Sequence, residues 1–528
     1  MKKEFVLAAI AILCAQIVLT GFGQNQTAAE RSLTIEKRYL LFPVKSASDN
    51  HPKQRVTLLV DGIVVRDFDI NLTDFPDWYA HLDVSGWKGK RATLRADKLP
   101  QNVNTLDLVA QSDEIWNIAD LYKESLRAQF HFSPRRGWNN DPNGLVFADG
   151  FYHLYFQHNP FGWSWGNMHW GHAVSRDLVH WTELPIAIYP FKYGDWAWSG
   201  SAVVDHHNTS GWKKGTNDLI VAAYTSTGRG ECIVYSNDGG KTFTEFEANP
   251  VVKHIGRDPR LLWFAPAKHW IMAVYDEFNK EHHIAFYTSL DLKQWTFQSR
   301  IAGFFECPDI FELNGKWVLT AANSDYMIGA FDGKKFTPET PKLKGHRGRG
   351  FYAAQTYSND PKGRVVQIGW LQTETRGMPF NQAMSLPMEL KLHQTPDGFR
   401  LGWHPIQELK LLRDGNNQAD TIDKFRSELI ELRSEFEGDA TFTIRGAKIQ
   451  YDSSKQEIDV NGHRAPAPLI DGKQQIIIYV DRTALEIFIS DGLTYIPMPF
   501  IPKSDNQTVA VNGNIKSIEL YRLKSIWR

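Results

Sequence analysis

The chain contains little cysteine and almost no net charge. Only three of its 528 residues are cysteine, and one of these, Cys14, lies in the N-terminal segment. The remaining two, Cys232 and Cys307, cannot build a disulfide framework, so we expect two free thiols. The 59 basic and 60 acidic residues nearly cancel, so the chain lacks the large field that binds nucleic acids, anionic membranes or polyanionic substrates. A neutral partner fits this balance better.

Long apolar runs are also missing, except at the N-terminus. Residues 1–23 open with two lysines after the first methionine, continue as an apolar run broken by Gln16, and end in a small-x-small sequence. This order predicts a cleaved secretory signal, since a spanning helix needs about 20 apolar residues. Cys14 leaves a lipid anchor as an alternative, although Leu13 stands where a lipidation motif has a small residue. We expect an exported protein, periplasmic or extracellular, without a transmembrane segment.

Helical periodicity is absent through most of the sequence, which alternates in short apolar segments instead. Within residues 30–112, Arg55–Val60 and Ile63–Asp67 flank the dipeptide Asp61-Gly62. Because Asp-Gly favours the tight turn between two paired strands, this segment predicts a hairpin. We therefore expect a small antiparallel N-terminal β-domain, joined to the next region by a linker of more helical character over residues 113–128.

The central region, residues 129–395, carries an internal repeat. One half of the repeat is a turn with aspartate followed by an aromatic residue and threonine, and the other half is an apolar strand rich in aromatics. Five strand copies at roughly regular spacing indicate five blades of a β-propeller. We interpret the turn aspartates as structural, namely Asp177, Asp238 and Asp291. The strand copies begin at Tyr152, Leu219, Trp270, Trp317 and Val365.

The C-terminal region returns to short strands. Residues 396–411 are expected to be a second linker, and residues 412–528 contain apolar segments such as Gln475–Val480 and Ala484–Ile489. This pattern is typical of a two-sheet β-sandwich. The predicted fold is therefore all-β, with a small N-terminal β-domain, a five-bladed β-propeller and a C-terminal β-sandwich.

Three carboxylates occupy equivalent places in the repeat. Asp141, Asp258 and Glu306 each precede the first apolar strand of a predicted blade. First strands of blades line the central channel, so the three side chains should meet at one mouth of that channel. Taken singly, the motifs have ordinary explanations, such as a turn at Asp141 or a surface ion pair between Arg257 and Asp258. Their shared phase in the repeat favours one common site.

Paired carboxylates in a sugar-sized funnel suit the cleavage of an acetal. One can attack the anomeric carbon while the other protonates the departing oxygen. We expect Arg257 to keep Asp258 ionised, and the apolar neighbours Phe304 and Phe305 to raise the pKa of Glu306. Flat faces on the 18 tryptophans can bind carbohydrate rings as well as pack. The histidine pairs show no convincing ligand set, so we expect neither a metal nor a cofactor.

Three ordered motifs resemble those of glycoside hydrolase family 32, the invertase, inulinase and levanase family. They are Trp138–Gly144, Arg257-Asp258-Pro259 and Glu306-Cys307-Pro308, and the resemblance extends from about residue 129 to the C-terminus. It implies a five-bladed propeller followed by a β-sandwich. It further implies Asp141 as nucleophile, Glu306 as acid/base, and Asp258 with Arg257 as the transition-state stabiliser that clamps the fructosyl hydroxyls. The implied fructosyl subsite is lined by Asn140, Gln157, Trp165, Trp198 and Ser199.

The sequence departs from the family pattern in three places. Asn139 stands where methionine is frequent, Trp198 stands where phenylalanine is frequent, and the N-terminal β-domain is absent from the core family pattern. Neither substitution removes a reacting group. The role of the added domain is open at this point, since it could shape the substrate entrance or only pack.

The resemblance implies a retaining β-fructofuranosidase that acts on levan or inulin, with sucrose as a further candidate substrate. Trp163, Trp165, the segment Trp196–Trp198 and the added N-terminal domain supply bulk around the entrance, so we expect a short pocket that releases terminal fructosyl units. Endo-acting levanase or inulinase activity and fructosyl transfer stay open as alternatives. A non-catalytic fructan-binding propeller is a different class, disfavoured because Asp141, Asp258 and Glu306 are all present. An inactive structural propeller has still less support. The protein is expected to be a monomer.

Overall fold

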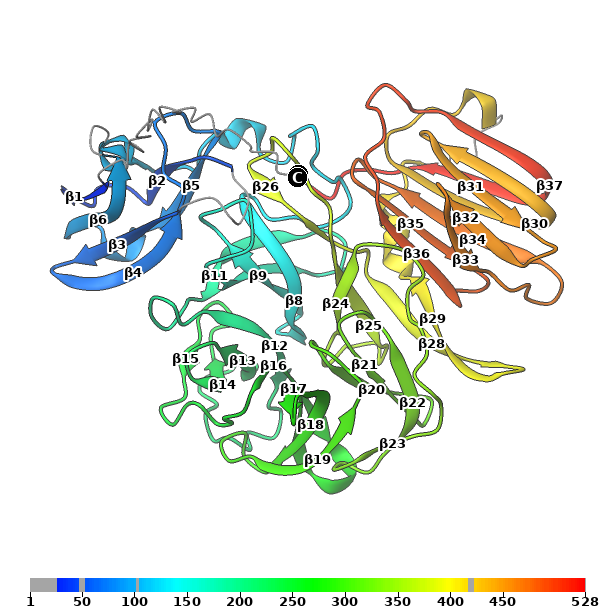
Figure 1. Ribbon diagram of the computed structural model, residues 1–528, viewed down its shortest axis with the longest axis horizontal. Coiled ribbons are helices and arrows are strands. Elements are labelled where there is room, and N and C mark those ends of the chain that lie inside the picture. Colours follow the sequence, from blue (N-terminus) through cyan, green and yellow to red (C-terminus); the bar gives the residue numbers. More distant parts are fainter. Residues whose placement is uncertain (1–25, 47–52, 101–103, 416–421, 528) are drawn as a thin grey trace, which may run out of the picture.

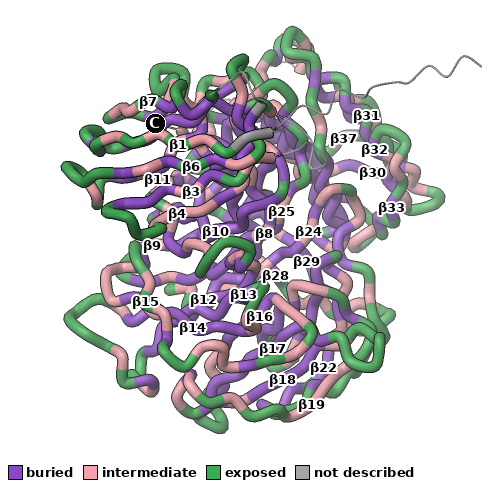
Figure 2. The backbone as a smooth tube through the Cα atoms, turned by 60° about the vertical axis from the view of Figure 1, so that its left-hand side comes forward, coloured by how far each residue is buried: buried purple, intermediate pink, exposed green. Residues whose placement is uncertain are grey.

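The computed structural model describes residues 26–46, 53–100, 104–415 and 422–527. The predicted signal segment, residues 1–23, lies outside these ranges. Within them no helix is long and apolar enough to cross a membrane. The predicted all-β fold is confirmed: an N-terminal β-domain, a propeller of five sheets and a C-terminal sandwich follow one another along the chain (Figure 1). Buried residues concentrate in the strands of all three parts, while exposed residues gather in the turns (Figure 2).

The N-terminal domain consists of two small antiparallel sheets that enclose an apolar core. The predicted hairpin is present, with Asp61 and Gly62 both at positive φ in its turn. The core also includes Phe161 of the propeller, stacked on Phe68 at 3.7 Å between ring centroids. The domain is thus packed onto the propeller. One sheet is β1 (Gln26–Thr34), β6 (Arg91–Pro100), β3 (Gln54–Val60) and β4 (Ile63–Ile70), and the other is β5 (Trp78–Asp83), β2 (Tyr39–Val44) and β7 (Ala110–Ser112), with 3₁₀ turns η1 (Ser85–Trp87) and η2 (Thr105–Leu108).

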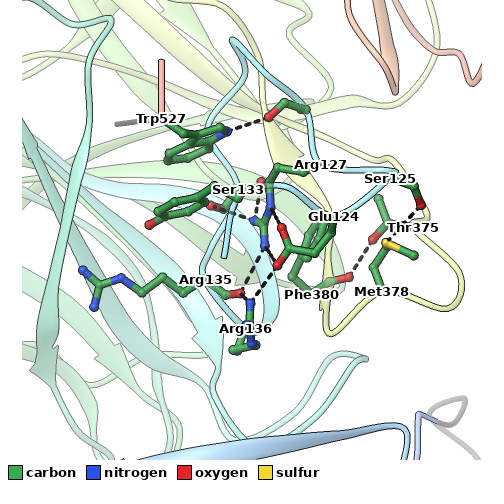
Figure 3. A network of polar contacts seen from close by, with 12 residues as sticks. Glu124, Ser125, Arg127, Ser133, Arg135, Arg136, Thr375, Met378, Phe380 and Trp527 are labelled. Carbon is green, nitrogen blue, oxygen red and sulfur yellow. Dashed lines mark hydrogen bonds and ion pairs between the residues drawn. The ribbon is translucent and has the colours of Figure 1, made fainter. Parts of the chain in front are cut away.

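The segment 113–128 contains only one 3₁₀ turn, η3 (Ile118–Asp120), so its expected helical character is wrong. The segment is fixed by Arg127, whose fully buried guanidinium donates hydrogen bonds to the Ser133 hydroxyl at 2.9 Å and to both oxygens of Glu124 (Figure 3). Arg127 also lies over the ring of Phe380, and Trp527 donates to the carbonyl of Ala128. These contacts hold the segment in an irregular path against the propeller.

Five sheets form the blades, which confirms the predicted number. Each sheet contains four antiparallel strands that follow one another in chain order, and the first and the fifth sheet each have one further short strand. The blades are β8 (Gly137–Ala148), β9 (Phe151–Asn159), β10 (His169–Ser175) and β11 (Thr182–Ile188); β12 (Ala197–Val204), β13 (Ile220–Ser226), β14 (Gly230–Ser236) and β15 (Thr244–Glu245); β16 (Gly256–Phe264), β17 (His269–Phe278), β18 (Glu281–Ser289) and β19 (Thr296–Ala302), with η4 (Ala265–Ala267); β20 (Asp309–Leu313), β21 (Lys316–Thr320), β22 (Tyr326–Phe331) and β23 (Phe336–Pro338); and β24 (Phe351–Thr356), β25 (Val366–Leu371), β28 (Met388–Thr395) and β29 (Gly398–Pro405).

The fifth blade extends past the expected boundary at residue 395. Its last strand, β29, pairs with β28 from Met388–Pro405 to Thr395–Gly398 and occupies much of the segment 396–411 that was expected to be a linker. The two turn residues Pro396 and Asp397 join these strands in a hairpin. The short strand β27 (Ala383–Met384) also pairs with β25.

The ring of blades is closed between the fifth blade and the first. A loop of the fifth blade carries β26 (Phe380–Asn381), which pairs in parallel with the start of β8. Ser358 of the same blade accepts from the N–H of Phe147 and donates its own N–H to Leu145. Hydrogen bonds therefore hold both ends of β8 against the fifth blade.

The turn aspartates of the repeat have the structural role expected for them. Asp177 accepts the backbone N–H groups of Val179 and His180 through one oxygen, and Asp238 and Asp291 accept equivalent pairs in the next two blades. Such bonds fix the turn between the third and fourth strands.

The C-terminal domain is one sheet folded into two layers. The first half of its longest strand pairs with β34 and the second half with β31, and the register breaks between Glu437 and Ala440, where Gly438 has φ +70°. Apolar residues from both halves share one core, as expected for a sandwich. The strands are β30 (Ile430–Ile444), β31 (Ala447–Asp452), β32 (Glu457–Val460), β33 (His463–Pro466), β34 (Gln474–Val480), β35 (Ala484–Ile489), β36 (Thr494–Pro499) and β37 (Val509–Arg522), preceded by η5 (Gln407–Leu412) and η6 (Ile422–Lys424).

A buried charged group joins the sandwich to the propeller. The imidazole of His131 lies between Asp481, at 2.9 Å, and Glu486, at 3.0 Å, and none of the three side chains is exposed. Asp481 also accepts the N–H groups of Gln129 and Phe130. The propeller thereby satisfies carboxylates that the sandwich buries.

Candidate active site

The inner strands of three blades begin with bulges that redirect side chains toward one cavity. The register of β8, β12 and β16 each shifts against the second strand of its blade near the strand's start. A bulge inserts unpaired residues and bends the strand, so that side chains can be re-aimed next to a site. The residues between the flanking ladder pairs are Asn140 and Asp141, Trp198 and Ser199, and Asp258 and Pro259.

Backbone conformation is unusual at the carboxylates of the third and fourth blades. Asp258, Glu306 and Cys307 have positive φ, at 67°, 55° and 39°. Residues other than glycine rarely adopt this region, and such positions persist only where surrounding contacts hold them. Here the N–H of Cys307 donates to Asp258 at 3.0 Å, and the carbonyl of Glu306 accepts from Ala322 at 3.1 Å. These contacts fix the two blades to each other at the site.

All nine residues singled out from the sequence line one cavity of about 330 Å³. They come from four of the five blades and from the loop between β9 and β10. Three further residues, Cys307, Tyr352 and Trp370, complete the wall. The nine are Asn140, Asp141, Gln157, Trp165, Trp198, Ser199, Arg257, Asp258 and Glu306.

Each carboxylate oxygen of Asp141 accepts a hydrogen bond from a neighbouring side chain. The Ser199 hydroxyl donates to one of its oxygens at 2.7 Å, and the Asn140 amide donates to the other at 3.1 Å. Trp138 donates its indole N–H to the Asn140 carbonyl oxygen and so orients that amide. Burial raises the pKa of Asp141 and the Glu306 charge adds to this, while the two hydrogen bonds oppose the rise.

Asp258 differs from the expectation. Burial, followed by the charge of Asp141, raises its pKa to about 7, and the Arg257 charge lowers the pKa without offsetting this rise. The reason is where the guanidinium lies. Arg257 Nε is 3.9 Å from Asp258, whereas Nε is 3.2 Å from Glu306 and Nη2 contacts Glu306 more closely still. Cys307 Sγ lies near both aspartates, 3.6 Å from Asp141 and 3.4 Å from Asp258.

Glu306 has polar partners instead of the expected apolar surroundings. Arg257 lies on one oxygen, and the hydroxyl of Tyr352 donates to the other at 2.8 Å. Phe304 is buried behind the site, and Phe305 packs near the Arg257 guanidinium. The sequence neighbours of Glu306 do not reveal which side chains reach it from other blades.

Tyr352 lines the cavity but was not predicted as a site residue. It is the second residue of β24, the inner strand of the fifth blade, whose register with β25 shifts between Tyr352 and Gln355. Burial and the nearby Glu306 charge raise the pKa of Tyr352, so the phenol stays a hydrogen-bond donor. Its position at the start of an inner strand, equivalent to that of the three carboxylates, was the signal that could have identified it.

Tryptophans form one wall of the cavity. Trp165 is 39% exposed at the rim and contacts both Trp196 and Trp198, with centroids 5.0 and 6.2 Å away. Gln157 is positioned by a 2.9 Å bond from its amide to the carbonyl of Ala197. Trp163 instead donates to the carbonyl of Phe380 and does not line the cavity.

Across the described ranges, no group of three or more histidine, cysteine or acidic side chains could hold a metal ion. His172, for example, hydrogen-bonds His153 inside the first blade at 3.0 Å. Cys232 and Cys307 are both free, as expected. The cavity therefore offers carboxyl, hydroxyl, amide and guanidinium groups around a small polar space, which suits acid–base and nucleophilic chemistry on a sugar.

The sequence of the chain is similar to those of known glycoside hydrolases. The sequence profile of the glycosyl hydrolases family 32 N-terminal domain matches residues 131–405. The levanase of Bacillus subtilis is 35% identical over 489 residues, covering 77% of this chain and 72% of the levanase. The extracellular exo-inulinase of Aspergillus awamori is 30% identical over 522 residues, covering 77% and 96%.

Solved structures agree with the sequence matches. The crystal structure of the Aspergillus awamori exo-inulinase superposes with a TM-score of 0.70 at 27% identity, covering 77% of this chain and all of that one. The β-fructofuranosidase of Schwanniomyces occidentalis complexed with fructosyl-erythritol gives 0.67 at 26% identity, covering 78% and 100%. The N-terminal β-domain precedes the matched family domain. The chain belongs to glycosyl hydrolases family 32 and is a glycoside hydrolase.

Proposed function

We propose that this protein is an exo-acting, retaining β-fructofuranosidase that removes terminal fructosyl units from levan or inulin and also cleaves sucrose. The observation that carries the proposal is the meeting of Asp141, Asp258 and Glu306 in one small cavity at the starts of inner strands. Its relatives include a levanase and an exo-inulinase. A binding protein would need no such set of carboxylates.

In the first step, an Asp141 oxygen attacks the anomeric carbon and forms a fructosyl ester. The bond to the leaving oxygen breaks, and protonated Glu306 gives that oxygen its proton. Ser199 and Asn140 hold the Asp141 carboxylate in place for this attack. In the second step, Glu306 takes a proton from water, and the water oxygen displaces Asp141. Two inversions give net retention.

Asp258 and Arg257 are proposed to bind the fructosyl hydroxyls. A carboxyl with a pKa of about 7 is partly protonated around neutral pH. It can therefore donate a hydrogen bond to a hydroxyl oxygen or accept one from a hydroxyl group. Arg257 is packed near Tyr275 and Trp198, which limits the directions in which its guanidinium can turn. Asn140, Gln157, Trp165, Trp198 and Ser199 are proposed to complete the subsite.

The size of the cavity favours exo attack. A space of about 330 Å³ is near the lower end of small-ligand sites and suits a chain end better than an internal segment. Trp165 and Trp198 close its side. Export to the periplasm or the cell exterior and a monomeric state are part of the same proposal; the Aspergillus relative is named extracellular.

A product assay tests the proposal. The purified protein is incubated with levan, inulin and sucrose, with Asp141→Asn as the matched inactive control, and early products are separated by chromatography. We expect free fructose as the main early product from the polymers. Early products that are mainly longer fructo-oligosaccharides would indicate endo attack, and products longer than the substrate would indicate fructosyl transfer. If no product formed, a non-catalytic binding protein would be the better explanation.

A further inference from the structure

A second hollow lies at the junction of the N-terminal domain and the propeller. Its volume is about 450 Å³, larger than that of the catalytic cavity. One side comes from β3 and β4, and the other comes from the loop between β11 and β12. The residues that matter here are Arg55, Arg66 and Asp67 on the first side, and Tyr189, Phe191 and Tyr193 on the second.

The loop side of the hollow presents aromatic rings to solvent. Phe191 is 57% exposed and Tyr193 is 39% exposed. A guanidinium packs on each ring, that of Arg229 at 3.9 Å from the Phe191 centroid and that of Arg55 at 3.8 Å from the Tyr193 centroid. The rings are therefore held in place while much of their surface stays open, so their apolar faces are available to pack on a ligand.

The same loop leads from this hollow to the catalytic cavity. It continues from Phe191 through Trp196 to Trp198, which lines the cavity. Lys192 and Asp195 form a β-bridge across its tip. Asp195 is 1% exposed, accepts from the Ser226 hydroxyl and from the Gly228 N–H, and so anchors the loop on the second blade. The two sites are linked by a fixed turn.

Asp69 of the N-terminal domain makes hydrogen bonds to residues near both the catalytic cavity and the hollow. Its backbone N–H donates to the Asn167 side chain at 2.8 Å, and the Asn167 amide donates back to the Asp69 carbonyl. Asn167 is two residues beyond Trp165, the rim residue of the catalytic cavity. The Asp69 carboxylate meanwhile accepts from the Tyr193 hydroxyl at 2.8 Å. One residue of the added domain thus positions both the rim and the hollow.

We propose that this junction is an outer groove that binds the body of a fructan chain whose end occupies the catalytic cavity. The proposal rests on the proposed function and deepens it. Exposed rings would take the apolar faces of fructosyl units, and Arg55, Asp67 and Lys192 would meet their hydroxyls. Arg55 is paired with Asp67, and the guanidinium of Arg66 packs on the Tyr189 ring, so these polar groups are held in place beside the exposed rings.

The variant Phe191→Ala tests the groove through chain-length dependence. Phe191 is exposed, so the fold should tolerate its loss. We expect KM for long levan or inulin to rise about fivefold, the loss of one stacking contact, with kcat and the sucrose kcat/KM unchanged. Phe297→Ala is the matched control, because Phe297 is an exposed ring under Arg300 on β19 and lines neither cavity. It should leave every value unchanged.

Binding without turnover separates the groove from the proposed activity. In the Asp141→Asn background, affinity electrophoresis through levan and inulin gels should show retardation that Phe191→Ala weakens and Phe191→Tyr restores. Equal KM values on long fructans for Phe191→Ala and wild type, or an equal loss on sucrose, would overturn the groove. If the wild type released no fructose, but its retardation in the gels still decreased on Phe191→Ala substitution, the proposed hydrolysis would be wrong and the groove would be supported.

Discussion

At the scale of single residues, the two aspartates of the cavity differ in the hydrogen-bond donors that surround them. Asp141 receives hydrogen bonds from a hydroxyl and an amide, whereas Asp258 receives one backbone N–H and a thiol contact and is 7% exposed. Burying a carboxylate with few donors costs free energy. The protein tolerates this cost at Asp258, and functional sites commonly trade stability in this way.

The variant Asp258→Asn should therefore be inactive but more stable than wild type at alkaline pH. The folded-state pKa of Asp258 is raised to about 7 from 3.8. The folded state then holds a proton that the unfolded state has lost, so this carboxyl lowers stability increasingly as pH rises through that window. We expect a gain on the order of 4 kcal/mol at pH 8, shrinking toward pH 4, from denaturant titrations. A gain that is independent of pH would contradict the assignment.

The variant Tyr352→Phe should slow catalysis by removing a positioning bond to Glu306. Because the Tyr352 hydroxyl donates to the oxygen of Glu306 opposite Arg257, its loss should lower kcat about tenfold on levan. The effect should be smaller on a fructoside with an acidic leaving group, since protonation by Glu306 matters less there.

Tyr275→Phe is the control for this prediction. Its hydroxyl hydrogen-bonds His282 and not Glu306, although its ring also packs near Arg257. An equal loss of kcat on both substrates for Tyr352→Phe would argue against a role at the acid/base.

At the scale of strands, the bulge at the start of β12 explains how Trp198 and Ser199 face the cavity. Gly200 follows the bulge, and a Cβ built on it would lie 1.9 Å from the carbonyl oxygen of Ala223 on β13. No side chain fits there without moving the backbone. The glycine therefore lets β12 approach β13 closely and sets the position of Ser199.

The variant Gly200→Ala should displace the strand and lose activity together with stability. We expect a loss of roughly 2 kcal/mol in unfolding free energy, as for other steric insertions, and a fall in kcat because Ser199 no longer meets Asp141. Gly86→Ala is the control, since a Cβ added to Gly86 would meet nothing within 4 Å and the φ of this glycine is ordinary. Full activity in Gly200→Ala would show that the bulge does not position Ser199.

The repeat made much of the site predictable at this scale. The common phase of Asp141, Asp258 and Glu306 placed all three at inner-strand starts, and the strand copies gave the number of blades. Partner choice across blades could not be predicted: Arg257 sits beside Asp258 in sequence but pairs with Glu306, and Tyr352 arrives from another blade. The prediction for segment 113–128 was wrong because the bonds of buried Arg127, and not local periodicity, decide its path.

At the scale of the whole molecule, His131 should make stability fall at alkaline pH. Burial alone would lower its pKa, but the bonds and charges of Asp481 and Glu486 raise it to about 9. Since the folded value exceeds the unfolded 6.5, the stabilisation is complete below pH 6.5 and is lost as pH rises through 9. The change should be on the order of 3 kcal/mol.

Calorimetry of His131→Gln checks this prediction. The variant should be less stable than wild type at about pH 7, because two buried carboxylates lose their charged partner, and its Tm should vary less between about pH 6.5 and 9.5. The control is His206→Gln, a change at an exposed histidine. If all three proteins lost Tm equally over this range, the buried cluster would not be the cause.

The added N-terminal domain contacts the propeller through Asp69, and the sandwich contacts it through the buried His131 cluster. The Phe191→Ala substitution in the proposed groove should raise KM only for long substrates. Removal of a reacting group should lower kcat for every substrate. Asp141→Asn is therefore expected to lower kcat by several orders of magnitude on levan, inulin and sucrose alike.

The anomer released first is the most direct test of covalent catalysis by Asp141. Proton NMR follows hydrolysis of a β-fructoside before mutarotation, with enzyme in large amount so that the first product dominates. Retention through a fructosyl ester predicts initial β-fructofuranose. Initial α-fructofuranose would mean a single inversion by water, and Asp141 could not then be the nucleophile.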